Sequence, residues 1–134
     1  MNGVHRAILK ISGGRLGWHA SGMPMLQLTT TGRKSGQKRS TMLSSPIQAG
    51  DSYLIVASRG GDDKHPAWFL NLLDNPHVEV VIQGRPMEPR IARVVSAEER
   101  ARFWPQITAE HRNYGGYQQK TDREIPLVLL DPVG

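Results

Sequence analysis

The chain has 134 residues, a formal net charge of +5 and no cysteine. This length predicts one domain that buries its own core, and the lack of cysteine excludes disulfides, thiolate metal ligands and a cysteine nucleophile. The basic charge favours acidic ligands, nucleic acid or an anionic membrane surface, and the absence of a signal peptide or long apolar span predicts a soluble, cytoplasmic protein.

The predicted elements of the first half are a helix, three strands and a second helix. Apolar residues at helical spacing predict an amphipathic helix over residues 4–12, which either lies on the fold or touches a membrane surface weakly. Strands are predicted over residues 25–30, 40–47 and 53–57, the second weakened near its end by Pro46. Pro66 opens a helix that ends before Asn75-Pro76.

The second half predicts a hairpin, a helix and a final strand. Strands over residues 78–82 and 87–95 form the hairpin, and Ser96 with Glu99 forms a capping box for a helix that runs to about residue 110, bent or interrupted at Pro105. Residues 125–130 form the last strand. Short turns and the lack of strict strand–helix alternation predict an α+β fold, a mostly antiparallel six-stranded barrel with helices packed outside. Residues 1–134 form one domain, with 1–22 as its N-terminal helix and loop.

The first candidate site is a basic loop after the first strand, with the sequence TGRKSGQKR. It holds four cations and two glycines between positions 32 and 39. Glycines let successive backbone N–H groups face one concavity, Arg33 and Arg39 can fork onto phosphate or carboxylate oxygens, and Lys34, Lys38 and Ser35 add charge and a donor. The spacing is not that of a P-loop, so it predicts an anion site rather than an ATPase. The alternative is a solvated hairpin tip.

Two further segments could border a flat ligand. The loop ASRGG follows the strongest strand, and a ring could lie on its nearly bare backbone; the alternative is a plain turn. Trp68 and Asn71 share one helix face and suggest an aromatic wall with an amide, unless Trp68 fills the core and Asn71 lies on the surface.

Tyr114 and Tyr117 could line a pocket and donate to a carbonyl, or pack at a rim with their hydroxyls in water. His65 and His111 are isolated from other metal-ligating residues, so no metal site is predicted. The chain thus offers few catalytic side chains of its own, which favours either a bound cofactor that carries out the reaction or no catalysis.

A family resemblance covers residues 12–132. In order, the blocks LTTTGRKSGQ, YLIVASRGG, HPAWFLNLLDNPHVEV, EERARFWPQ, YGGYQ and TDREIPLVLL resemble the deazaflavin-dependent nitroreductase family. These are split-β-barrel oxidoreductases that use coenzyme F420. The chain departs from the family at Ser44-Ser45-Pro46 and at His111, where many members carry an aromatic residue; both changes imply a wetter and roomier pocket.

The resemblance implies a role for each candidate residue. The phosphate and the start of the oligoglutamate tail would be held by Arg33, Lys34, Ser35, Gly36 and Arg39. The deazaflavin ring would be bordered by Val56, Ala57, Ser58, Arg59, Gly60 and Gly61, and by Ala67, Trp68 and Asn71 from the helix. Tyr114 and Tyr117 would lie over the ring where the second substrate enters and hydrogen-bond it.

The resemblance implies transfer of a hydride from reduced F420 to an electron-poor small molecule: a quinone, a nitroaromatic or an activated enone. A monomer or a homodimer is expected, without nucleic acid. Two other functions remain open on the residues alone. One is a non-catalytic basic barrel that binds nucleic acid. The other is a barrel that carries FMN, a lipid or another cofactor.

Overall fold

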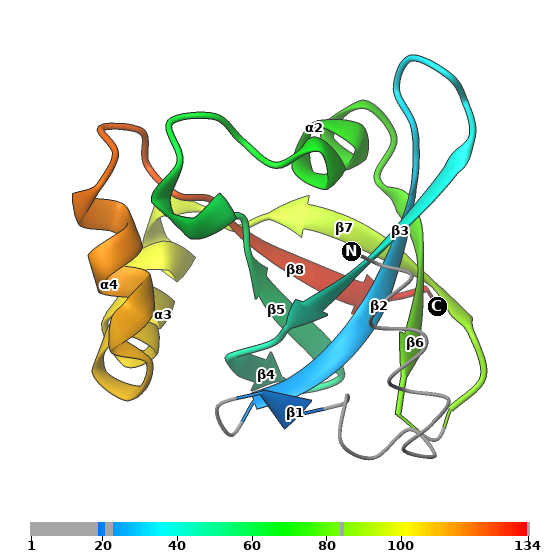
Figure 1. The fold of residues 1–134 in the computed structure, drawn as a ribbon. Helices are drawn as coiled ribbons and strands as arrows, with labels where there is room; N and C mark the ends of the chain where they lie inside the picture. The colour runs from blue at the N-terminus through cyan, green and yellow to red at the C-terminus, as the bar shows by residue number, and fades with distance from the viewer. Residues whose placement is uncertain (1–18, 21–22, 84, 134) are drawn as a thin grey trace.

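An antiparallel sheet curls into the body of the protein in this computed structural model, which describes residues 19–20, 23–83 and 85–133 (Figure 1). Within those residues the sheet has eight strands. They are β1 (His19–Ala20), β2 (Met23–Thr31), β3 (Lys38–Ser44), β4 (Ile47–Ala49), β5 (Ser52–Val56), β6 (His77–Ile82), β7 (Glu88–Val94) and β8 (Leu127–Pro132). The helical elements are the short 3₁₀ turn η2 (Arg59–Gly61), α2 (Ala67–Asp74), α3 (Ala97–Glu110) and α4 (Arg112–Gln119).

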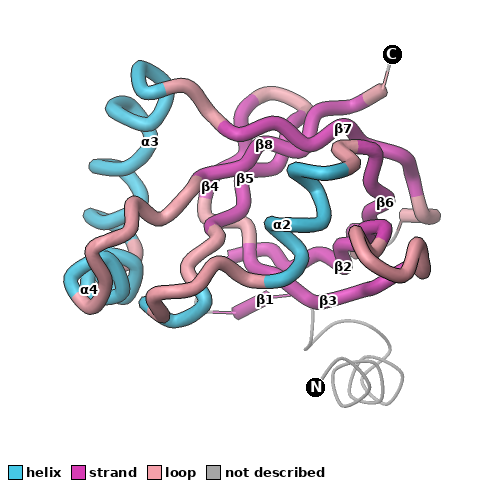
Figure 2. Tube along the Cα trace, turned by 90° about the horizontal axis from the view of Figure 1, so that it is seen from above, coloured by secondary structure: helices cyan, strands magenta, loops and turns pink. Residues whose placement is uncertain are grey.

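The strand order closes most of a barrel. Hydrogen-bonded neighbours run β1-β2-β6-β7-β8-β5-β4, and all pairs are antiparallel. Strand β3 pairs with residues 25–31 of β2, beyond the two residues of β2 that pair with β1. Because only Ser45-Pro46 separates β3 from β4, the two ends of this order meet along the chain. Seen from above, α2 lies over the barrel interior while α3 and α4 lie together outside it (Figure 2). The predicted α+β class, with a mostly antiparallel barrel and helices around it, is confirmed. The predicted count of six strands is wrong: eight are described, because β1 was not predicted and the strand predicted over residues 40–47 is two strands.

The differences from the predicted elements have local causes. Pro46 has no N–H to donate, and the strand predicted over residues 40–47 is divided there into β3 and β4. Helix α3 runs to Glu110 as predicted, and it is not interrupted at Pro105. Helix α4 was not predicted, because Gly115 and Gly116 lie in its middle and glycine is a poor helix former. The helix predicted over residues 4–12 lies outside the described residues.

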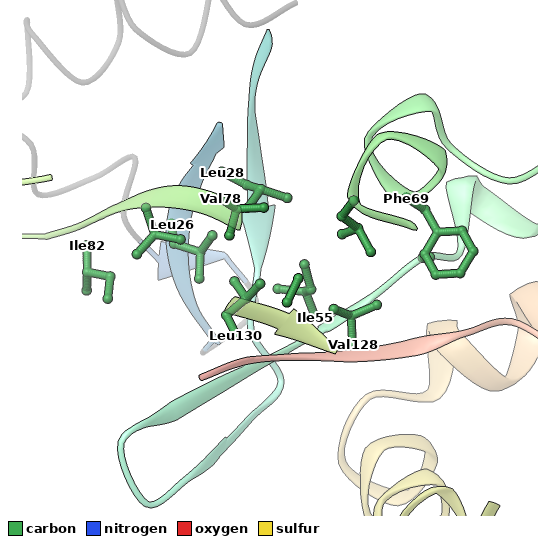
Figure 3. Close-up of a cluster of buried hydrophobic side chains, with 12 residues drawn as sticks. Leu26, Leu28, Ile55, Phe69, Val78, Ile82, Val128 and Leu130 are labelled. Carbon is green, nitrogen blue, oxygen red and sulfur yellow. The ribbon is translucent and has the colours of Figure 1, made fainter. Parts of the chain in front are cut away.

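Strands β5 and β8 are apolar on both faces because each face is covered. Side chains alternate along a strand, so the paired residues Ile55 and Val128 point into the barrel, where they join the core beneath α2 (Figure 3). The next pair, Leu54 and Leu129, points the other way and packs against a second core formed with α3 and α4. This double burial explains the uninterrupted apolar runs in the sequence.

The helix α3 begins at the predicted capping box. The Ser96 Oγ accepts from the backbone N–H of Glu99 at 3.1 Å, and the Glu99 carboxylate accepts from the Ser96 N–H at 3.0 Å. Hydrogen bonds from Arg93 and from the Ser96 N–H lower the pKa of Glu99 to about 2. Glu99 is therefore ionised throughout the neutral range and fixes the start of the outer helical layer.

Shortening a side chain in the barrel core should lower the free energy of unfolding far more than shortening an exposed side chain. Leu130 is 0% exposed, and Leu130→Ala should lower the free energy of unfolding by about 2–5 kcal/mol through lost burial and the cavity left behind. Leu73 is 55% exposed, and Leu73→Ala should change it by less than about 1 kcal/mol. Urea unfolding measures both; equal losses would contradict the assignment of the core.

Candidate functional site

A groove of about 410 Å³ runs between the β2–β3 loop and helix α2. One wall comes from the basic loop and the strand ends beside it, and the other from the first turns of the helix. The lining residues are Thr30, Gly32, Arg33, Lys34, Ser35, Arg39, Ser40, Thr41, Ala67, Trp68 and Asn71. The fold thus brings the loop predicted to bind an anion together with the helix residues predicted to form a wall.

The basic loop is held in shape by its own hydrogen bonds. Gly32 N–H donates to the Gln37 carbonyl and Gly36 N–H donates to the Gly32 carbonyl, both at 2.8 Å. A Cβ on Gly32 would lie 2.8 Å from the Ser35 Oγ, and Gly36 has a φ of 73°, which favours glycine. Both glycines therefore serve the tight turn that gathers the cations.

Asn71 connects the helix to this loop. Its side chain is 4% exposed, so it is not the surface residue of the alternative interpretation. The Asn71 Oδ1 accepts from the Arg33 backbone N–H at 3.2 Å and from its Nη1 at 3.1 Å, while Nδ2 donates to the Thr30 Oγ1 at 3.2 Å. Trp68, three residues earlier, is half-buried and both lines the groove and packs against the barrel core.

The groove carries positive charge that no carboxylate in the described part of the chain neutralises. Within the described residues, Arg33, Lys34 and Arg39 have no acidic partner, and no Asp or Glu lines this groove. Lys38, by contrast, pairs with Glu79 on β6 at 3.5 Å and does not line it. Two guanidinium groups, an ammonium group and the Ser35 hydroxyl form a donor set that suits phosphate and carboxylate oxygens.

A second groove of about 680 Å³ continues from the first and shares Arg33 and Ala67 with it. Its other lining residues are Arg59, Asp63, Lys64, His65, Pro66 and Leu70. The loop after β5 thus reaches this site through Arg59, which is exposed and has a φ of 48°.

The beginning of that loop is buried. Val56 and Ala57 are 7% and 0% exposed, and their side chains lie in the two cores. The Ala57 N–H already donates to the Pro126 carbonyl at 3.0 Å. A ligand would therefore meet the loop only from Ser58 onward, within the turn η2 that includes Arg59, Gly60 and Gly61.

The two tyrosines lie on α4, against this loop rather than on either groove. A Cβ on Gly61 would come within 2.6 Å of the Tyr117 carbonyl oxygen, so the helix packs directly on the turn. Tyr114 is 7% exposed, its hydroxyl lies 3.9 Å from the Met23 Sδ, and burial raises the pKa of Tyr114. The half-buried Tyr117 ring packs edge-on against it at 5.9 Å.

The positions where the chain departs from the family's aromatic residues also lie off both grooves. Ser45 is 0% exposed and its hydroxyl donates to the Ile47 carbonyl at 3.0 Å, so it adds no polar group to either groove. His111 lies between α3 and α4, with its ring 6.4 Å from that of Tyr114.

Thr30, Ser40 and Thr41 line the first groove but were not predicted from the sequence. A signal existed for one of them: Thr30 continues the inward row of Leu26 and Leu28 and is 1% exposed, so a polar residue occupies a core-facing position at the strand end. Among the described residues no cluster could hold a metal ion, and no helix has the length and apolar character needed to cross a membrane.

Comparison with known proteins decides the family. Residues 3–132 match the family described as F420H(2)-dependent quinone reductase. The chain belongs to this family. The predicted membership of an F420-using oxidoreductase family is confirmed, and with it the coenzyme and the enzyme class.

Relatives of this quinone reductase family cover nearly the whole chain. An F420H(2)-dependent quinone reductase of Mycobacterium tuberculosis is 38% identical over 136 residues, which is 95% of this chain and 87% of that protein. A solved F420-H2 dependent reductase is 41% identical, covers 81% of this chain and 94% of its own, and has a TM-score of 0.70. A second solved structure, described as a domain-swapped dimer, is 38% identical, covers 96% of both chains and has a TM-score of 0.72.

Removing the Asn71 amide should weaken both the fold and coenzyme binding. Asn71→Ala leaves the Arg33 N–H without its acceptor and should cost about 1–3 kcal/mol in urea unfolding, with several-fold weaker F420 binding in a fluorescence titration. Asn75→Ala is the matched control at the C-cap of the same helix, since its side-chain oxygen accepts only an exposed hydrogen bond from the His77 N–H. Unchanged F420 affinity in Asn71→Ala would show that Asn71 does not position Arg33.

Proposed function

We propose that the first groove holds the phosphate and the start of the oligoglutamate tail of F420, and that the protein presents the reduced ring to a small electron-poor acceptor. A quinone is the acceptor class that the family's description favours, with nitroaromatics and activated enones as further substrates. The observation that carries the proposal is a set of three cations beside Trp68, namely Arg33, Lys34 and Arg39, which have no acidic partner among the described residues.

The anionic end of the coenzyme is assigned to the basic loop. Arg33 and Arg39 would bind its oxygens through paired N–H groups, Lys34 would add a point charge, and Ser35 and the Gly36 turn would add donors. Support comes from the hydrogen bonds to Asn71, which hold the Arg33 guanidinium toward the groove before any ligand arrives. A preformed set of donors lowers the entropic cost of binding.

The ring end is assigned to the junction of the two grooves. Trp68 and Ala67 would form a wall on α2, and the backbone from Ser58 to Gly61 would border the opposite edge, with Val56 and Ala57 supporting that loop from the core. When bound, the coenzyme supplies a hydride from its deazaflavin ring. The protein's own part is to orient the ring, exclude water along Trp68 and leave one ring face open to the acceptor.

Contact with the acceptor is assigned to Tyr117, and a supporting role to Tyr114. The Tyr117 hydroxyl has no internal partner within the described residues and is free to donate to an acceptor oxygen that gains electrons. Tyr114 is buried, and its ring contact fixes the position of Tyr117. A phenol suits this role because it donates a hydrogen bond at neutral pH without carrying a charge.

The proposal extends to partners. The protein acts on a small molecule, as a monomer or a homodimer, and light scattering distinguishes these two states. Location in the cytoplasm, with weak contact between the basic segment 4–12 and an anionic membrane surface, is part of the same proposal and is supported by the net charge of +5.

Neutralising the basic loop should weaken coenzyme binding. Arg33→Ala or Lys34→Ala should raise the F420 dissociation constant about 10- to 100-fold at low salt, because each removes a charge-assisted contact to phosphate or carboxylate. The difference from wild type should shrink as salt rises. Arg85→Ala, an exposed cation next to the β6–β7 hairpin, should leave binding unchanged. If neither loop variant weakens binding, the phosphate assignment is wrong.

Removing the Tyr117 hydroxyl should slow hydride transfer without weakening coenzyme binding. Tyr117→Phe should lower the anaerobic single-turnover rate with a quinone about tenfold, since a hydrogen bond to developing charge is lost. Tyr114→Phe should have a smaller effect. Tyr53→Phe, on β5 and beside Arg90, controls for loss of a tyrosine hydroxyl elsewhere. If Tyr117→Phe transfers hydride at the wild-type rate to every acceptor class, Tyr117 does not contact the acceptor.

A further inference from the structure

One guanidinium group holds most of the loop that follows β5. Arg123, shortly before β8, donates from Nε to the Asp62 carbonyl at 2.8 Å, from Nη1 to the Ala57 carbonyl at 3.1 Å and from Nη2 to the Ser58 carbonyl at 2.7 Å. The same Nη1 lies 3.0 Å from the His65 Nδ1. Arg123 therefore contacts both ends of residues 57–65, a segment that borders the second groove.

These bonds determine which backbone groups the loop can offer to a ligand. The carbonyls of Ala57, Ser58 and Asp62 are turned toward Arg123. Ser58 has α-helical dihedrals and Arg59 has left-handed ones, a combination that directs successive N–H groups to one side. Within the described part of the chain, the N–H groups of Ser58 and Arg59 have no internal acceptor.

We propose that Arg123 is a positioning residue for the coenzyme site: it holds the loop 57–65 in the shape that offers these amides to the ring, and it does so only while His65 is neutral with its proton on Nε2. The inference rests on the proposed function, since it concerns the ring end of the same site. A guanidinium has donors only, so the His65 Nδ1 must accept. A protonated imidazole carries hydrogen on both nitrogens and cannot.

The surroundings of His65 favour its neutral form. Arg123 contacts its ring directly, the cations Arg33, Arg59 and Lys64 line the same groove, and Asp63 is the one carboxylate among the groove's described lining residues. From α2 the Phe69 ring packs on the His65 ring, with the centroids 4.9 Å apart. Burial, and then the charge of Arg123, lower the pKa of His65 below its usual 6.5. The unfolded chain thus binds this proton more readily than the folded one. The contribution of His65 to the free energy of unfolding therefore rises with pH up to about 6.5 and is lost as the pH falls below that value.

The first test measures hydrogen exchange in the ligand-free protein at pH 7.5. The amides of Gly61 and Asp62 are protected by bonds to the Ser58 and Arg59 carbonyls, at 3.0 and 3.2 Å. Arg123→Lys keeps the charge but not the fork of donors, and should speed exchange at both amides at least about tenfold. Arg100→Lys is the control: Arg100 anchors the same C-terminal segment through the Ile125 carbonyl and should leave both amides protected. Unchanged exchange in Arg123→Lys overturns the proposal.

Coenzyme titration separates this inference from the proposed function. Arg123→Lys should also weaken F420 binding about tenfold in a fluorescence titration at pH 7.5. If exchange speeds up while affinity stays unchanged, and Arg33→Ala still weakens binding, Arg123 has no role toward the coenzyme and the proposal fails alone. If Arg33→Ala also leaves affinity unchanged, the proposed function fails with it.

The tautomer is tested with His65→Asn, which keeps a side-chain acceptor but does not titrate. After correction for intrinsic rates, the Gly61 and Asp62 amides of the wild type should exchange faster at pH 5.5 than at pH 7.5, and those of His65→Asn should not. The same pH dependence in both proteins would overturn the requirement for neutral His65.

Discussion

The hydrogen bonds between Asn71 and Arg33 connect the two walls of the site, and its shape depends on them. One wall is a hairpin loop whose cations repel one another, and the other is a helix held over the barrel by Phe69 and Leu72. Packing places the helix, and the buried amide then transmits that position to the loop. Without this connection the repulsion between the cations would favour a loop in which they lie further apart.

The unpaired charge of the groove has a cost that a ligand can relieve. Arg33, Lys34 and Arg39 line one groove, and none of its described lining residues is a carboxylate. Like charges gathered in one cleft destabilise the folded state. Many proteins are less stable than they could be because their binding sites keep such unfavourable arrangements. An anion that binds the folded state alone repays this cost. Lys38, just outside the groove, differs from these three cations in having an acidic partner, Glu79.

How much the sequence could predict depended on how local each determinant is. Strands such as β5 and β8 were predictable because their apolar runs reflect burial on both faces. The start of α3 was predictable because the two residues of its capping box, Ser96 and Glu99, lie three residues apart. The basic loop was predictable because its cations are neighbours along the chain. Helix α4 was missed because packing on Gly61 overrides the low helix propensity of Gly115 and Gly116.

The remaining gaps come from contacts between distant segments. No pattern in the sequence joins Asn71 to Thr30, which are 41 residues apart, or Arg123 to the Ser58 carbonyl, 65 residues away. The burial of Tyr114 against Met23 is equally non-local, at a separation of 91 residues. Residue type alone could suggest an amide or a phenol at the site, but the partner that decides its role is found only in the folded chain.

The two ends of the site therefore depend on the fold in different ways. The basic loop is closed by bonds among residues 32–37, so its turn can form as soon as β2 and β3 pair. The loop 57–65, which we propose lies beside the ring, is hydrogen-bonded by Arg123, a residue just before the strand that pairs with β5. Local opening of the C-terminal segment would release the ring end while leaving the anion-binding turn intact, because the two share no hydrogen bond in the described structure. If the proposed assignment holds, affinity for the ring would be coupled to the stability of the β5–β8 pair, and affinity for the anionic tail to that of the β2–β3 hairpin and its bonds to Asn71.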